Sequence, residues 1–206
     1  SFIGIPEHAS PRRYQLQFGA ALKEAKKLKG HNLLMTAIGD DVSYWLNSAM
    51  RGILLADYTF DKYHSDKKET PELNLGILTG VDSASFKKEE QYSHMMASAV
   101  ALARDLVNEP ANVMTPSALA EEAKAVCDKH NIKCTILEKE DCEALGMNAF
   151  LSVAKGSKQP PKFIVMEYNG RVTDEEKIAL IGKGICFDAG GYNLEPSASM
   201  KGRHGD

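Results

Sequence analysis

Apolar residues recur along the chain at alternating helical and strand spacings. Four segments have apolar residues at helical spacing: 11–28, 42–56, 85–108 and 116–130. The last of them follows Thr115-Pro116, a pair typical of a helix start. Five short apolar runs predict strands: 32–38, 73–79, 132–137, 163–168 and 178–181. A further short helix is expected around 141–145, and this alternation predicts an α/β fold.

The helical segment 85–108 is the longest. Met95, Ala99, Leu102 and Leu106 form an apolar stripe along it, which we interpret as packing against a core rather than as a binding face. Pro110 stops the segment. A long helix at this position could join two domains.

The composition is that of a globular protein. The chain has 206 residues, of which 43% are hydrophobic and 26% charged, so it holds one large or two small domains. With 25 Lys and Arg against 28 Asp and Glu, it has no positive field to attract nucleic acid or anionic lipid. No apolar run approaches the ~20 residues that span a bilayer. We therefore expect neither a nucleic-acid nor a membrane partner.

Four cysteines lie in the second half of the chain: Cys127, Cys134, Cys142 and Cys186. Their spacing contains no CxxC pair of the kind used for zinc or thiol redox chemistry. We expect buried free thiols and a reducing compartment, the cytoplasm or an organellar matrix.

Candidate chemistry gathers in residues 182–206, which follow the predicted strand 178–181. Ligands of open α/β sheets bind at the carboxyl ends of strands. Asp188 precedes Ala189-Gly190-Gly191, whose small side chains would let a cation approach, and Lys183 could join it as a neutral amine. A phosphate-binding loop is an alternative, although the glycines match neither GxxxxGK[ST] nor GxGxxG. The residues alone also leave open that Asp188 caps a helix and Lys183 is solvated.

Three sequence blocks resemble one known family. GKGICFDAGG at 182–191, continued by Pro196, is similar to the leucyl (cytosol) aminopeptidase signature, which is close to GKGxxFDxGGxxxKP. ARDLVNEPANVMTP at 103–116 and GMNAFLSVAKGSKQPPKFIVMEY at 146–168 agree with the same family in order and spacing. The chain is identified as a partial member of that family on these blocks, which span about half of it.

The resemblance implies a domain organisation. Residues 1–90 would form an N-terminal α/β domain that is incomplete at its start, and residues 91–108 a connecting helix. Residues 109–206 would be the N-terminal part of the metallo-aminopeptidase catalytic domain. Family members typically assemble as hexamers, so a homo-oligomer is expected.

The resemblance also implies a metal site. Lys183, Asp188 and Asp206 match metal ligands, with Asp188 bridging two divalent ions (Zn, Mn or Mg) that activate water for attack at peptide N-termini. The segment MKGRHGD departs from the common MDxMxxD pattern but keeps Met200 and Asp206. His204 matches no ligand, and Cys186 is not expected to act as a nucleophile. We assign no catalytic side chain and no organic cofactor.

Two departures from the family pattern count against activity. Glu195 stands where the signature has a lysine that would stabilise the oxyanion, and a carboxylate there would repel it. The chain also ends before the NTDAEGR-type segment that supplies the remaining family ligands. We expect this chain alone to be inactive, with weak or single metal occupancy. The alternative is a degenerate member that acts as a structural or interaction subunit.

Overall fold

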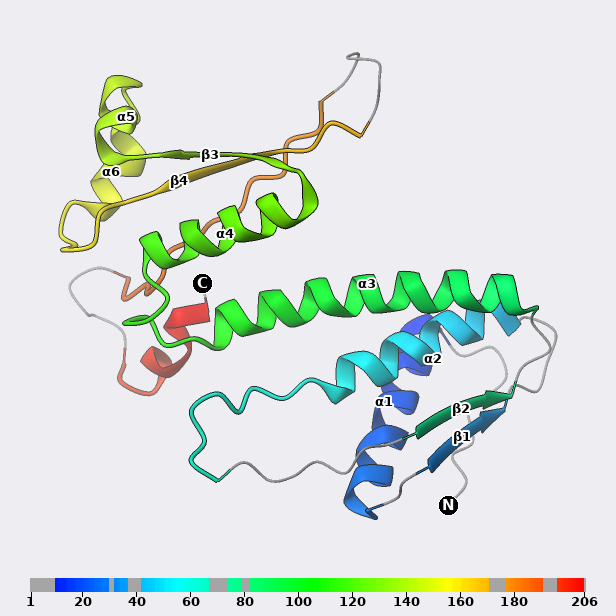
Figure 1. Cartoon of the computed structure of the whole chain (residues 1–206). Helices are drawn as coiled ribbons and strands as arrows, with labels where there is room; N and C mark the ends of the chain where they lie inside the picture. Colours follow the sequence, from blue (N-terminus) through cyan, green and yellow to red (C-terminus); the bar gives the residue numbers. More distant parts are fainter. Residues whose placement is uncertain are drawn as a thin grey trace. The chain divides into compact units, whose positions relative to one another are not determined.

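The computed structural model (Figure 1) describes residues 10–29, 32–36, 42–66, 74–78, 82–170, 177–190 and 196–205. The chain divides into two compact units, residues 1–105 and 106–206. The expected domain limits at residues 90 and 108 stay predictions. The boundary between the two compact units falls inside a helix, and it does not show which residues belong to which functional domain.

Each unit combines helices with a two-stranded sheet. The first contains α1 (Pro11–Lys27), β1 (Asn32–Thr36), α2 (Val42–Asp57), β2 (Asn74–Leu78) and most of α3 (Ser83–Asn108). The second contains α4 (Pro116–His130), β3 (Lys133–Leu137), α5 (Lys139–Ala144), α6 (Asn148–Ala154), β4 (Phe163–Glu167) and the 3₁₀ helix η1 (Ser199–Gly205). The predicted α/β class is confirmed, as are the four long helices and four of the five strands.

Local chemistry explains where α1 and α4 begin. The Ser10 hydroxyl accepts a hydrogen bond from the Arg13 N–H at 3.4 Å, and Pro11 is the first residue of α1. The Thr115 hydroxyl accepts from the Ala118 N–H at 3.3 Å in the same way. Each cap satisfies one of the N–H groups that a helix start leaves without an intrahelical partner. The helix start predicted at Thr115-Pro116 is confirmed.

The core of the first unit lies between α1 and α2. Phe18 and Leu22 of α1 and Ala49 and Ile53 of α2 form a buried cluster. The ring of Trp45 stands edge-on to Phe18 with centroids 5.4 Å apart. This geometry is the favoured one for an aromatic pair, and it fixes the register of the two helices.

Gly52 allows α1 and α2 to approach closely. A Cβ at this position would lie 2.8 Å from the Cα of Gln15, inside any real contact distance. Because the obstacle is backbone rather than a flexible side chain, a larger residue would have to push the helices apart.

Replacing Gly52 with alanine is expected to lower the free energy of unfolding by about 2 kcal/mol, because the clash outweighs alanine's higher helix propensity. Trp45, the single tryptophan, reports the unfolding of this unit in a urea titration followed by fluorescence. Gly156→Ala is the control, since a Cβ there meets nothing within 4 Å. Equal stability of the Gly52→Ala and native proteins would contradict the close approach.

The two sheets differ in strand direction. β1 and β2 pair in parallel, from Asn32 opposite Asn74 to Thr36 opposite Leu78. β3 and β4 pair antiparallel, from Lys133 opposite Glu167 to Leu137 opposite Phe163. In the second unit α4 packs against β3 and β4, where burial and the neighbouring Cys134 of β3 raise the pKa of the buried Cys127 thiol of α4. All four cysteines are free thiols, as predicted, although Cys134 and Cys186 are only half-buried.

The strand predicted at 178–181 is wrong. Residues 177–190 contain neither helix nor strand, and the side chains of Ile178, Leu180 and Ile181 are 91%, 94% and 97% exposed. An apolar run becomes a strand only when a neighbouring strand pairs with its backbone. Among the described residues none pairs with this segment. The helix α6 and the 3₁₀ helix η1 were not predicted.

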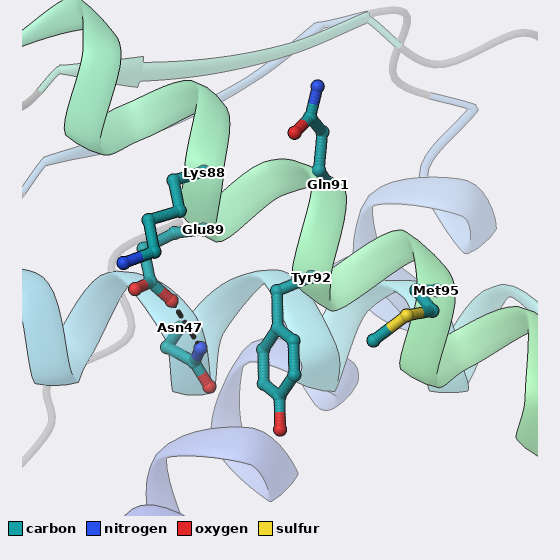
Figure 2. A pocket seen from close by; sticks show the side chains of 6 residues that line it. All are labelled: Asn47, Lys88, Glu89, Gln91, Tyr92 and Met95. Atoms are coloured by element: carbon teal, nitrogen blue, oxygen red, sulfur yellow. Dashed lines mark hydrogen bonds between the residues drawn. The ribbon is translucent and has the colours of Figure 1, made fainter. Parts of the chain in front are cut away.

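The prediction that Met95 packs in a core is also wrong, since Met95 is 58% exposed. Instead, α3 contacts α2 through longer side chains. Figure 2 shows Tyr92 and Met95 extending from α3 towards α2, and Asn47 of α2 hydrogen-bonded to Glu89. These side chains, with Lys88 and Gln91, line an open cavity of about 470 Å³.

Within the described part of the chain, no helix is long and apolar enough to cross a membrane.

Candidate metal site

The structure brings together two of the three predicted metal ligands. Lys183 and Asp188 lie on the extended segment that runs through the second unit before η1 (Figure 1). The Nζ of Lys183 lies 3.1 Å from the Oδ2 of Asp188. Asp206, the third predicted ligand, and Glu195 lie outside the described residues.

Backbone contacts hold Asp188 in place. Its Oδ1 accepts a hydrogen bond from the Gly190 N–H at 2.9 Å, and its own N–H donates to the Arg203 carbonyl of η1 at 3.2 Å. Gly190 has a φ of +70°, a conformation that glycine adopts without strain. One carboxylate oxygen is thus engaged by the backbone, and the other faces the lysine.

The surroundings of Asp188 favour its charged form. The Gly190 N–H, the hydrogen bond and charge of Lys183 and the charge of Arg203 together hold the pKa of Asp188 below its ordinary value, against a smaller opposing effect of burial. The side chain is 33% exposed and that of Lys183 is 53% exposed. Asp188 is therefore an anion at neutral pH and remains accessible to a cation.

The donor set is compatible with a metal but does not complete a site. A carboxylate and a neutral amine can both bind a divalent ion, whereas the charged amine of a lysine cannot. Among the described residues, no three His, Cys, Asp or Glu side chains gather as a metal cluster. The Lys183–Asp188 pair would therefore need further donors to hold a metal ion.

Two neighbouring residues, Cys186 and His204, have no role as nucleophile or metal ligand that the described residues indicate. Burial raises the pKa of the Cys186 thiol, so the reactive thiolate is disfavoured. His204, next to Arg203 in η1, is half-buried and joins no described cluster of metal-binding side chains. The contact of Arg203 with Asp188 was missed by sequence reasoning, because it depends on how η1 folds back on the loop.

Comparison with known proteins gives one family. The family model described as the catalytic domain of the cytosol aminopeptidase family matches residues 101–206. A probable cytosol aminopeptidase of Alkaliphilus oremlandii (strain OhILAs) is 42% identical over 193 residues, covering 90% of this chain and 39% of the relative. Its counterpart in Treponema denticola is 44% identical over 151 residues, covering 72% of this chain and 32% of the relative.

Two solved structures of other proteins are similar to this chain. The bottromycin maturation enzyme BotP in complex with Mn has a TM-score of 0.82 and 25% identity, covering 99% of this chain and 43% of that chain. A lysine-to-glutamate mutant of tomato leucine aminopeptidase has a TM-score of 0.71 and 29% identity. The match covers 77% of this chain and 33% of that chain. The chain spans between 32% and 43% of the length of these relatives and solved structures.

Proposed function

Because this chain belongs to the cytosol aminopeptidase family, we propose that the protein containing it removes N-terminal residues from peptides with two divalent metal ions. The Lys183–Asp188 pair, with its 3.1 Å contact inside the segment that the family model matches, is the observation that carries this proposal. The manganese in the similar BotP structure supports a divalent metal of this kind.

The residues have distinct roles under this proposal. Asp188 would hold both ions, because its two oxygens can bind separately, and the Gly190 N–H bond would keep the carboxylate oriented. Lys183 would bind as a neutral amine, and Asp206 would supply a second carboxylate. When bound, two such ions polarise the peptide carbonyl and lower the pKa of a water that attacks it.

Assembly and location are further proposals. On the basis of family membership, we propose that the complete protein assembles as a hexamer, acts on peptide N-termini and is located in the cytoplasm or an organellar matrix. The relatives' names as cytosol aminopeptidases support the location.

A second candidate function rests on Glu195. A carboxylate in place of the signature lysine would oppose the negative charge that develops on the substrate oxygen. A member with this change could serve as a structural or interaction subunit without turnover. The support for this alternative is the sequence, since Glu195 lies outside the described residues.

The experiment compares two purified proteins on leucine amide with Mn²⁺ or Zn²⁺. A complete protein, which holds this segment and an entire catalytic domain of the family, is expected to release leucine, to stop with EDTA and to recover when Mn²⁺ is restored. Hydrolysis that EDTA leaves unchanged would overturn the metal-dependent function, and no hydrolysis at all would favour the subunit.

We propose that the 206-residue polypeptide by itself has no turnover. Its three candidate ligands cannot fill two coordination spheres of about four to six positions each. Metal-dependent turnover by this polypeptide, abolished by Asp188→Ala, would show that it holds enough ligands.

A further inference from the structure

Helix α3 lacks the apolar contacts that hold α1 and α2 together. Among its 26 described residues the only buried one is a serine, Ser93. The buried cluster between α1 and α2 has no member from α3 in the described part of the first unit. Burial of an apolar face is the usual reason that a helix stays on its neighbour, so α3 must be held on α2 by other contacts.

Polar side chains join the two helices instead. Near the start of α2, the Asn47 amide donates a hydrogen bond to the Glu89 carboxylate (Figure 2). Farther along, the Arg51 guanidinium lies 4.8 Å from the centre of the Tyr92 ring. A third set of contacts lies at the end of α2 and involves four residues: Leu55, Tyr58, Arg104 and Asp105.

We call this third set the α2 clamp. The Nη1 of Arg104 donates to the Leu55 carbonyl at 2.8 Å, and its guanidinium lies 5.3 Å from the centre of the Tyr58 ring. The Tyr58 hydroxyl donates to the Oδ1 of Asp105 at 2.8 Å. Because α2 ends at Asp57, the Leu55 carbonyl is one of the four that a helix end leaves without an intrahelical partner. Arg104 therefore caps α2 with a positive charge, which also suits the negative end of the helix dipole.

The α2 clamp is stronger than an ordinary surface contact. Leu55, Tyr58 and Arg104 are half-buried, and a hydrogen bond from a charged donor to a partly enclosed carbonyl is worth more than a neutral one. The contacts also depend on one another, because the Tyr58 ring touches Arg104 while its hydroxyl is fixed by Asp105. Loss of one contact should therefore weaken the others.

We propose that the α2 clamp keeps α3 docked on α2, and that α3 leaves α2 when the clamp is broken while the core between α1 and α2 stays folded. All four clamp residues belong to the first unit. Arg104 and Asp105 lie in the block 103–116, and the proposed metal chemistry uses neither of them, so the inference does not rest on the proposed function. The clamp gives these two residues a role.

Hydrogen exchange of the 206-residue chain, followed by mass spectrometry, tests the proposal. Arg104→Met removes the charge and the hydrogen bond but keeps an apolar stem of similar length. Peptides from α3 are expected to exchange about tenfold faster, the effect of losing one charge-assisted hydrogen bond, because a helix without its neighbour is only marginally stable. Peptides from α1 and α2 should keep their rates. Lys87→Met, which removes an exposed cation of the same helix, should change neither.

A double-mutant cycle tests whether the clamp acts as a unit. Tyr58→Phe keeps the ring and removes the hydroxyl, and Asp105→Ala removes the acceptor of the same hydrogen bond. Each variant alone should speed the exchange of α3 about threefold. The double variant should also be about threefold faster rather than about ninefold, because both changes delete one bond.

Three results would overturn the inference. The first is equal exchange of α3 in Arg104→Met and the native chain, and the second is an additive effect in the double variant. The third is an equal acceleration of α1, α2 and α3, which would show that the helices unfold together. Fluorescence of Trp45, which packs on the core between α1 and α2, checks that each variant folds. If Arg104→Met does not fold, Arg104→Gln and Tyr58→Phe give the same comparison.

Discussion

Replacing Asp188 with asparagine is expected to lower the kcat/KM of the complete protein for leucine amide by ~10³-fold or more, equivalent to several kcal/mol of lost metal stabilisation. Asparagine has nearly the same shape, and its oxygen can still accept the Gly190 N–H bond seen at 2.9 Å. It lacks the negative charge, and its amide nitrogen offers no lone pair to a second ion. The change therefore tests the charge and the second oxygen while leaving the loop intact.

Steady-state kinetics at several Mn²⁺ concentrations would measure this effect. Asp128→Asn is the matched control, because Asp128 is exposed on α4 in the same unit and has no part in the proposed site. Its kcat/KM should equal that of the native protein. A similar loss in both variants, or activity retained by Asp188→Asn at saturating metal, would show that Asp188 is not a metal ligand.

Replacing Glu195 with lysine should raise the kcat of the complete protein by ~10²-fold, the scale on which one oxyanion donor acts. The substitution turns a repulsive carboxylate into an attractive ammonium at the position where the family signature has lysine. Because the substrate oxygen becomes negative chiefly in the transition state, kcat should change more than KM. Initial rates over a range of leucine amide concentrations, at saturating Mn²⁺, separate the two constants.

Two further variants sharpen this experiment. Glu195→Gln removes the repulsion without adding attraction, so its kcat should fall between those of the native protein and Glu195→Lys. Glu140→Lys makes the same charge reversal at an exposed position of α5 and should leave kcat unchanged. An unchanged or reduced kcat in Glu195→Lys would mean that the oxyanion role assigned to this position is wrong.

Much of the secondary structure could be predicted because its causes are local. The start of α4 depends on the Thr115 hydroxyl, the fixed φ of Pro116 and an N–H three residues along the chain. The face that α1 turns to the core follows from Phe18 and Leu22 at helical spacing. Such features need no knowledge of distant residues.

The failed predictions concern residues whose structure depends on distant partners. Ile178, Leu180 and Ile181 have the composition of a buried strand, yet β pairing needs a second strand at the right place. Met95 lies on an apolar stripe, but whether such a stripe is buried depends on what packs against it. Hydrophobic spacing describes the side of an element that can be buried, and it does not identify the partner.

The sequence by itself determined the family, through three ordered blocks, and the residue types at positions 183, 188 and 195. Only the tertiary structure decided that the Lys183 amine lies 3.1 Å from the Asp188 carboxylate and that Arg203 reaches the same aspartate from η1. The physical reason is that charge interactions depend on distance and enclosure. Fifteen positions separate Asp188 from Arg203 in the sequence, while one hydrogen bond joins them in space.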